Sequence, residues 1–215
     1  MCIRDSLVPV GEKYLFPEFD TLINLGGFAN ITKKIKNNLI AYDICPINII
    51  FNHLSRIIKL EYDDKGDIAS SGNINKDLYN YLQRLDYYKL DPPKSLGIEW
   101  VNNYVYSILK NFNNISIKDL MNTFSNHFAF QIAKNIGEQD QVLITGGGAY
   151  NDYLINRIKK LTNSKLTIPD PNIIEYKEAL IFSFLGLLRV LKINNCYSSV
   201  TGAKKDHCSG ILYNP

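Results

Sequence analysis

Short apolar runs separated by tight turns follow the first twenty residues and predict a β-meander. Residues 21–25 are mostly apolar and end at a pair of glycines, residues 31–35 alternate between apolar and polar positions, and residues 39–43 form a third run after a Lys-Asn-Asn turn. Runs of this length, bounded by glycine or asparagine, are typical of strands. We therefore expect three consecutive strands, with glycines at the first corner.

The middle of the chain has the apolar spacing of helices. Pro46 suits the first turn of a helix, where its missing N–H costs nothing, and Ser116 is a good N-cap for a helix whose apolar residues keep helical spacing. Helices are expected over residues 46–60, 76–85, 95–111 and 116–136.

The last third of the chain alternates between strand and helix. Strands are expected at 141–145 and 165–168, and helices at 149–161 and 175–191. Residues 7–11 are predicted to be extended because Pro9 interrupts them, and the tail from residue 194 is predicted to be irregular. This order predicts an α/β fold in which a mixed sheet carries helices on both faces.

Composition narrows the class of protein. The chain is 46% hydrophobic and 21% charged, its net charge is +3, and its lysines are scattered, which argues against nucleic acid or an anionic membrane as a partner. The most apolar stretch, 179–188, is much shorter than the roughly 20 residues of a membrane helix. No secretory signal, no CxxC pair and no clustered histidines are present, so we expect a cytoplasmic protein with reduced thiols and no metal site.

Two glycine-rich loops are the candidate functional segments. Residues 24–30 (Asn-Leu-Gly-Gly-Phe-Ala-Asn) and 145–151 (Thr-Gly-Gly-Gly-Ala-Tyr-Asn) each follow a predicted strand. Glycine lets backbone amides approach a phosphate closely, so two such loops in one domain predict a nucleotide lying between them. The first loop is also explained by a tight hairpin without a ligand, and the second by a strand-to-helix connection, although three glycines are more than a connection needs.

Seven motifs in register resemble the anhydro-N-acetylmuramic acid kinase family, whose members have the actin/Hsp70/hexokinase-like fold. The resemblance therefore implies the ribonuclease H-like, actin-like ATPase lobe. The motifs are Leu-Val-Pro-Val-Gly at 7–11, Asn-Leu-Gly-Gly-Phe-Ala-Asn at 24–30, Asp-Ile-Cys-Pro-Ile-Asn at 43–48, Pro-Pro-Lys-Ser-Leu-Gly-Ile-Glu at 92–99, Gly-Gly-Gly-Ala-Tyr-Asn at 146–151, Glu178-Ala179, and Thr-Gly-Ala at 201–203.

The resemblance implies an ATP-dependent sugar kinase. The family phosphorylates 1,6-anhydro-N-acetylmuramic acid at O6 and opens the anhydro ring with water, giving N-acetylmuramic acid 6-phosphate during cell-wall recycling. Magnesium is expected with the ATP, and a homodimer is expected for the full-length protein. The implied nucleotide-binding residues are Gly26, Gly27, Asn30, Gly146, Gly147, Gly148 and Asn151, and the implied sugar-binding residues are Asp43, Asn48 and Glu178.

Two of these residues also have structural explanations. The Asp43 carboxylate is placed to cap the following helix. Glu178 is placed in the first turn of the predicted last helix, where a carboxylate favours the helix dipole.

The chain departs from the family pattern in two places. Cys45 and Ile47 stand where many members have glycine, and the family's first phosphate loop and catalytic aspartate, which precede the Leu-Val-Pro motif, are absent. We expect residues 7–215 to be the C-terminal portion of the kinase and residues 1–6 to be a non-native or disordered leader resembling a translated library adapter. Such a chain is expected to be inactive alone. Another sugar or acyl-phosphate kinase of the same superfold, and a non-catalytic one-lobe nucleotide-binding module, remain as alternatives.

Overall fold

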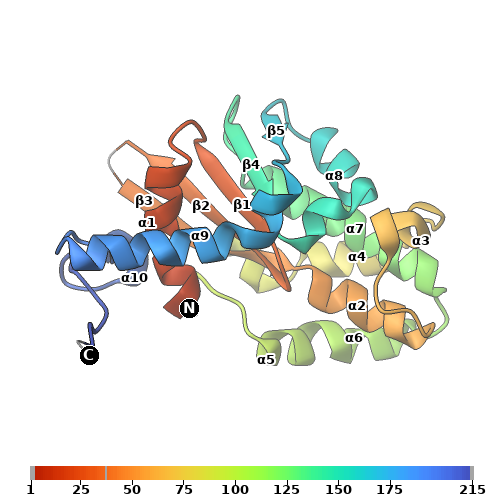
Figure 1. Cartoon of the computed structure of the whole chain (residues 1–215). Coiled ribbons are helices and arrows are strands. Elements are labelled where there is room, and N and C mark those ends of the chain that lie inside the picture. The colour runs from red at the N-terminus through yellow and green to blue at the C-terminus, as the bar shows by residue number, and fades with distance from the viewer. Residues whose placement is uncertain (1–2, 37, 214–215) are drawn as a thin grey trace.

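A mixed five-stranded sheet in the order β3-β2-β1-β4-β5 forms the centre of the computed structural model, which describes residues 3–36 and 38–213 (Figure 1). The first three strands pair antiparallel, which confirms the predicted meander, whereas β4 pairs parallel with both β1 and β5. The strands are β1 (Thr21–Leu25), β2 (Phe28–Ile35), β3 (Asn38–Pro46), β4 (Gln141–Thr145) and β5 (Lys165–Thr167).

The predicted helices follow the predicted order with shifted ends, whereas the helices at 3–15, 67–70 and 198–201 were not predicted. Ser116 caps its helix as predicted, its Oγ accepting from the Asp119 N–H at 3.3 Å. The helices are α1 (Ile3–Leu15), α2 (Asn48–Ile57), α3 (Asp67–Ser70), α4 (Lys76–Gln83), α7 (Ile117–Lys134), α8 (Asp152–Lys159), α9 (Pro171–Val190) and α10 (Ser198–Thr201). An irregular helix joins α5 (Ile98–Trp100), a π-helical stretch (Val101–Tyr106), α6 (Ser107–Leu109) and a 3₁₀ turn (Lys110–Phe112), and further 3₁₀ turns lie at Asp64–Gly66, Asp86–Lys89 and Gly147–Tyr150.

Pro46 and Pro9 were both placed wrongly by the sequence analysis. Pro46 ends the edge strand β3, where the missing N–H breaks no ladder bond, and α2 begins two residues later. Residues 7–11, expected to be extended, lie inside α1, and Pro9 is within that helix. α1 packs closely against α9, since a Cβ on Gly11 would lie only 2.5 Å from Ile181 Cγ2. This packing stabilises α1 by more than Pro9 destabilises it.

The predicted leader overlaps the start of α1. Residues 3–6 form its first turn, and residues 1–2 lie outside the described part of the chain. The assignment of residues 1–6 as a non-native leader and of 7–215 as the C-terminal portion of a kinase stays a prediction.

The sheet is buried on both faces, as predicted. Ile23 and Leu25 of β1 enter a large cluster with α2, α7 and α8, whereas Leu22, the residue before Ile23, packs with Phe16 and Leu143 on the opposite face. Figure 1 shows α1 and α9 crossing this opposite face, with α7 behind the sheet. Helices therefore cover both faces and leave the ends of the strands accessible.

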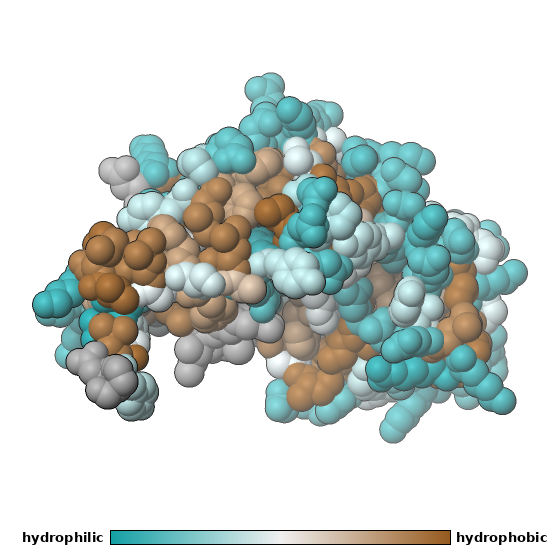
Figure 2. Space-filling view, in the orientation of Figure 1, coloured by the Kyte–Doolittle hydropathy of each residue, from teal (hydrophilic) through white to brown (hydrophobic). Residues whose placement is uncertain are grey.

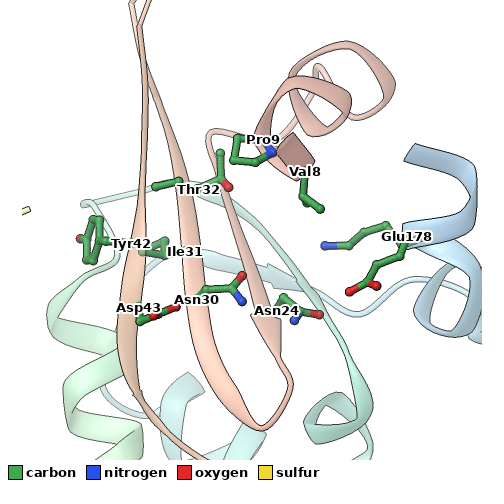
Figure 3. A pocket seen from close by; sticks show the side chains of 11 residues that line it. Val8, Pro9, Asn24, Asn30, Ile31, Thr32, Tyr42, Asp43 and Glu178 are labelled. Carbon is green, nitrogen blue, oxygen red and sulfur yellow. The ribbon is translucent and has the colours of Figure 1, made fainter. Parts of the chain in front are cut away.

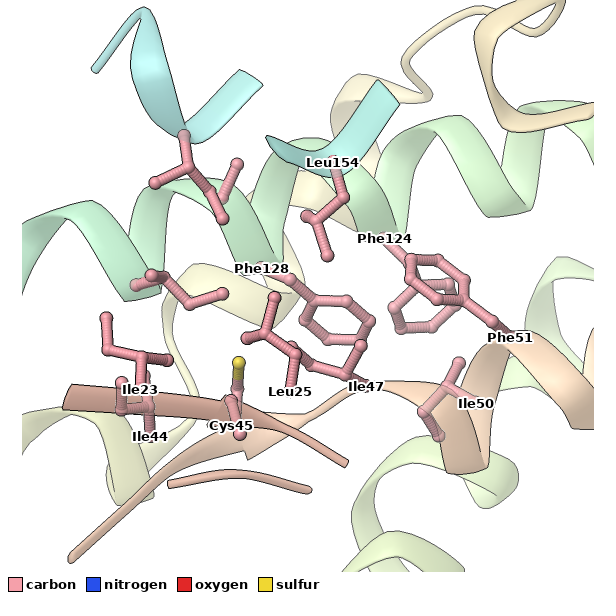
Figure 4. Packing of buried hydrophobic residues seen from close by; sticks show 14 of the residues in the cluster. Ile23, Leu25, Ile44, Cys45, Ile47, Ile50, Phe51, Phe124, Phe128 and Leu154 are labelled. Atoms are coloured by element: carbon pink, nitrogen blue, oxygen red, sulfur yellow. The ribbon is translucent and has the colours of Figure 1, made fainter. Parts of the chain in front are cut away.

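Cys45 and Ile47, the residues that replace family glycines, belong to the large cluster. Both are 0% exposed, and Figure 4 shows them among Phe128, Leu25 and other apolar side chains beneath α7. Burial raises the pKa of the Cys45 thiol well above its ordinary value. The two side chains fill the core, so neither of them narrows a ligand cavity.

The outer face of α9 is apolar and uncovered. Tyr176, Leu180, Leu187, Val190 and the following Leu191 are each between 43% and 65% exposed. Figure 2 shows hydrophobic residues gathered around the C-terminal end of this helix. Within the described part of the chain, no helix combines the length and apolar character needed to cross a bilayer.

A buried ion pair joins α1 to α9. Lys177 Nζ lies 2.7 Å from Glu12 Oε1, and the two side chains are only 3% and 4% exposed. The pair holds together the two helices that cover one face of the sheet.

We predict that Lys177→Met destabilises the fold by about 3–5 kcal/mol, because it leaves the Glu12 carboxylate buried without its partner. Adding Glu12→Leu should restore most of the loss, and Lys159→Met, at an exposed position of α8, should change little. Urea unfolding of the four proteins measures this. A double variant as unstable as the single one would show that the charge pair is not the cause.

Candidate functional site

The two glycine loops lie side by side at one end of the sheet. Because β1 and β4 pair parallel, with Asn24 opposite Thr145, both strands end at the same edge. Gly146 has a φ of +80°, and a Cβ there would lie 2.9 Å from the Leu25 carbonyl carbon. A Cβ on Gly148 would lie 2.7 Å from the Leu25 Cβ. Packing between the loops therefore requires glycine at positions 146 and 148.

Gly27 and Gly147 are different. Neither has a positive φ. A Cβ on Gly27 would meet no described atom within 4 Å, and one on Gly147 would meet only Asn48 Nδ2 at 3.9 Å. Neither the backbone conformation nor the packing of the described chain explains why these two residues are glycines. Both expose their backbone at the same edge of the sheet.

The first glycine corner also receives the N-terminus of α2. The backbone N–H groups of Ile47 and Ile49 donate to the Gly27 carbonyl at 2.8 and 3.3 Å, and that of Asn48 donates to the Gly26 carbonyl at 3.2 Å. The Asn48 side chain donates through Nδ2 to the Leu25 carbonyl at 3.1 Å. Asn48 thus fastens α2 to the hairpin and lies beside the second glycine loop.

A cavity of about 690 Å³ opens beside these loops. Its walls come from α2, the 3₁₀ turn at 64–66, the second glycine loop and the start of α9. Asn151 lines it and caps α8, its Oδ1 accepting from the Leu154 N–H at 2.9 Å. Of the predicted site residues, this cavity is lined by Gly147, Gly148, Asn48 and Asn151.

A row of polar side chains crosses the sheet on the face covered by α1 and α9. Asn24 pairs in register with Asn30, and Asn30 pairs with Asp43. Figure 3 shows the three side chains directed toward one hollow, with Glu178 of α9 on its other side. The hollow has a volume of about 20 Å³, enough for about one water molecule. The buried Thr145 hydroxyl beside Asn24 makes no hydrogen bond within the described chain.

Asp43 holds the Pro-Pro-Lys-Ser segment against the sheet. Its Oδ2 accepts from the Leu96 N–H at 2.8 Å, its N–H donates to the Lys94 carbonyl at 3.2 Å, and its carbonyl accepts from the Tyr87 hydroxyl at 2.6 Å. Burial, followed by the nearby Asp43 charge, raises the pKa of Tyr87. The expectation that Asp43 caps the next helix was wrong, because α2 has Ile47 as its N-cap and no side-chain cap bond.

Glu178 is not in a first helical turn. Because Asp170 caps α9 and Pro171 opens it, Glu178 is the eighth residue of that helix, too far from its N-terminus for the dipole explanation. It lines the polar hollow, whereas Glu175, three residues earlier, lines the large cavity and bonds the Tyr150 hydroxyl at 3.0 Å. One helix therefore contributes a carboxylate to each cavity.

The predicted site residues divide into two groups that differ from the sequence assignment. Asn30, assigned to the nucleotide, lines the polar hollow with Asp43 and Glu178, and Asn48, assigned to the sugar, lies at the large cavity. Asn24 was missed, although the symmetric asparagines on either side of a two-glycine corner were a signal for it. Across residues 3–36 and 38–213, no group of three or more His, Cys, Asp or Glu side chains has the arrangement of a metal site.

Comparison with solved structures supports the fold. The activator of the 2-hydroxyisocaproyl-CoA dehydratase from Clostridium difficile, solved with bound ADPNP, superposes with a TM-score of 0.53 at 20% identity over 88% of this chain and 68% of its own. Component A of the (R)-2-hydroxyglutaryl-CoA dehydratase from Acidaminococcus fermentans gives 0.50 at 16% identity over 83% of this chain and 65% of its own. Both have the actin-like ATPase fold, which this chain shares.

Sequence comparison gives the family. Residues 5–215 match the family model described as anhydro-N-acetylmuramic acid kinase. Proteins of that name from Bacillus cereus (strain Q1) and Francisella tularensis subsp. novicida are 32% and 33% identical over 97% and 92% of this chain. The chain spans 60% and 57% of their lengths. This chain belongs to the anhydro-N-acetylmuramic acid kinase family.

Proposed function

We propose that this chain is the C-terminal part of a kinase that uses ATP to phosphorylate 1,6-anhydro-N-acetylmuramic acid, with hydrolytic opening of the anhydro ring. Family membership and the names of the relatives support the reaction. The assignment of the nucleotide site rests on the exposed backbone at Gly27 and Gly147. Neither the conformation nor the packing of the described chain requires glycine at these positions. Open glycine backbone of this kind suits close approach by phosphate.

The nucleotide is proposed to lie along the sheet edge. The nucleoside occupies the large cavity, the phosphates pass Gly147 and Gly27, and the sugar lies at the opening of the small hollow lined by the polar row of Asn24, Asn30 and Asp43. Glu178 faces that row from α9, the helix that also lines the nucleoside cavity. Since phosphoryl transfer depends mainly on positioning and electrostatics, one helix bordering both ligands suits this reaction.

The remaining parts of the proposal rest on the family resemblance. Magnesium is expected to arrive with the ATP phosphates, since protein sites for nucleotide-bound magnesium commonly supply only one or two carboxylates. We propose a cytoplasmic location and a homodimer for the full-length protein. The chain spans 60% of the length of its Bacillus cereus relative, and we expect no kinase turnover from it by itself.

We predict that Gly147→Ala weakens ADP binding at least about tenfold, because the added methyl group meets the phosphates rather than the chain. Its free energy of unfolding should stay within about 1 kcal/mol of the parent value. The matched control is Gly146→Ala, where the positive φ and the contact with Leu25 should cost more than about 1 kcal/mol.

Calorimetric titration with ADP and urea unfolding separate the two effects. A Gly147→Ala protein that binds ADP like the parent chain would contradict the phosphate assignment.

Asp43 is predicted to have separable structural and ligand roles. Asp43→Ala should cost about 1–3 kcal/mol of unfolding free energy, because the Leu96 N–H loses its acceptor. Asp43→Asn keeps an acceptor oxygen, so it should stay close to the parent in urea unfolding, while its lost charge weakens binding of the anhydro sugar in the presence of ADP. Unchanged sugar affinity in Asp43→Asn would leave Asp43 only its role in fastening the Pro-Pro-Lys-Ser segment.

A further inference from the structure

The large cavity is lined by acidic side chains and, along one edge, by glycine backbone. Asp64, Asp152 and Glu175 contribute carboxylates, and Lys65 is the cationic side chain in its wall. Carboxylates accept hydrogen bonds from hydroxyl and amino groups and repel phosphate. The interior of the cavity is thus suited to the ribose and base of a nucleotide, and its glycine edge to the phosphates.

Two tyrosines in this wall are exposed to solvent. Tyr62 is 58% exposed and Tyr150 is 42% exposed, and both line the cavity. A phenol ring offers a large flat surface on which a heteroaromatic base can stack, with little conformational entropy to lose.

Tyr150 is held in place by the second glycine loop. The 3₁₀ turn at Gly147–Tyr150 is closed by the Ala149 N–H donating to the Gly146 carbonyl at 2.9 Å, and by the Asn151 N–H donating to the Gly148 carbonyl at 3.1 Å. The Tyr150 hydroxyl is hydrogen-bonded to Glu175 at 3.0 Å. The ring is therefore positioned beside the proposed phosphate path before any ligand arrives.

The segment that carries Tyr62 is fixed from the other side. The Asp63 carboxylate is buried and accepts from the N–H groups of Ile68 at 2.9 Å and Ala69 at 3.0 Å. Gly66 has a φ of +77° and packs so closely on the second glycine loop that a Cβ would lie 2.3 Å from Asn151 Oδ1. The Tyr-Asp-x-x-Gly stretch at 62–66, which the sequence suggests only as a polar loop, is thus fastened to the nucleotide loop as a wall of the cavity.

We propose that Tyr62 and Tyr150 stack on the nucleobase and supply affinity for the base in this cavity, an inference that rests on the proposed nucleotide site. In this arrangement the phosphates lie at the glycine edge, so the two tyrosines contribute to base affinity and not to phosphate affinity.

The test is calorimetric titration of the 215-residue chain and its variants with ADP and with inorganic pyrophosphate. Tyr62→Ala and Tyr150→Ala should each weaken ADP binding about 5- to 100-fold, the range expected for loss of one stacked base contact. Tyr62→Phe and Tyr150→Phe keep the ring and should stay within about threefold of the parent chain. Pyrophosphate affinity should be the same in all variants. The matched control is Tyr81→Ala, because Tyr81 is an exposed tyrosine that lines a different groove.

Each contrary outcome has a distinct meaning. If both alanine variants bind ADP like the parent chain, the base lies elsewhere and only this inference fails. Equal losses for ADP and pyrophosphate would show that the tyrosines shape the loop, which also overturns it. If the parent chain binds ADP no more tightly than pyrophosphate, the stacking role is likewise excluded. If it binds neither ligand, the proposed nucleotide site falls together with the inference.

Discussion

The parallel pairing of β1 with β4 is the constraint on which the rest of the site depends. It places a hairpin corner and a strand-to-helix loop at one sheet edge, although more than a hundred residues separate them in the sequence. Gly146 and Gly148 allow the second loop to rest on Leu25. With the loops in contact, Asn48 can bond the Leu25 carbonyl, and α2 can begin on the carbonyls of the first corner. Close packing thus requires glycine at positions 146 and 148, whereas the glycines at 27 and 147 leave the backbone exposed.

The helix α9 connects the two parts of the site. Its carboxylates at 175 and 178 border the large cavity and the polar hollow, respectively. Between them, Lys177 is buried against Glu12 of α1, so the segment that presents both carboxylates is also the segment fixed to the neighbouring helix. A rigid contact at this point keeps the positions of the two carboxylates coupled, as positioning-dependent chemistry requires.

The sequence predicted the elements whose determinants are local. Alternation and turn residues were enough for the meander, and the Ser116 cap and apolar spacing were enough for α7. It failed where tertiary packing decides: α1 contains Pro9 because α9 covers it, and Pro46 ends a strand because β2 pairs with it. Asn24, Asn30 and Asp43 form one row only through strand register, and Tyr62 borders the glycine loop only because Gly66 packs on Asn151. Motif order gave the correct family without showing which asparagine faces which cavity.

The most direct test of the account is a nuclear magnetic resonance titration of the chain labelled with ¹⁵N-glycine, in which the amides of its 13 glycines report on ADP. The account predicts that the Gly27 and Gly147 amide resonances shift most, followed by their loop neighbours, while those of Gly186, Gly202 and Gly210 stay in place. Adenosine without phosphates should move the Gly27 resonance far less than ADP does. Shifts confined to other glycines, or none at Gly27 and Gly147 at saturating ADP, would contradict the claim that these two open positions form the phosphate path.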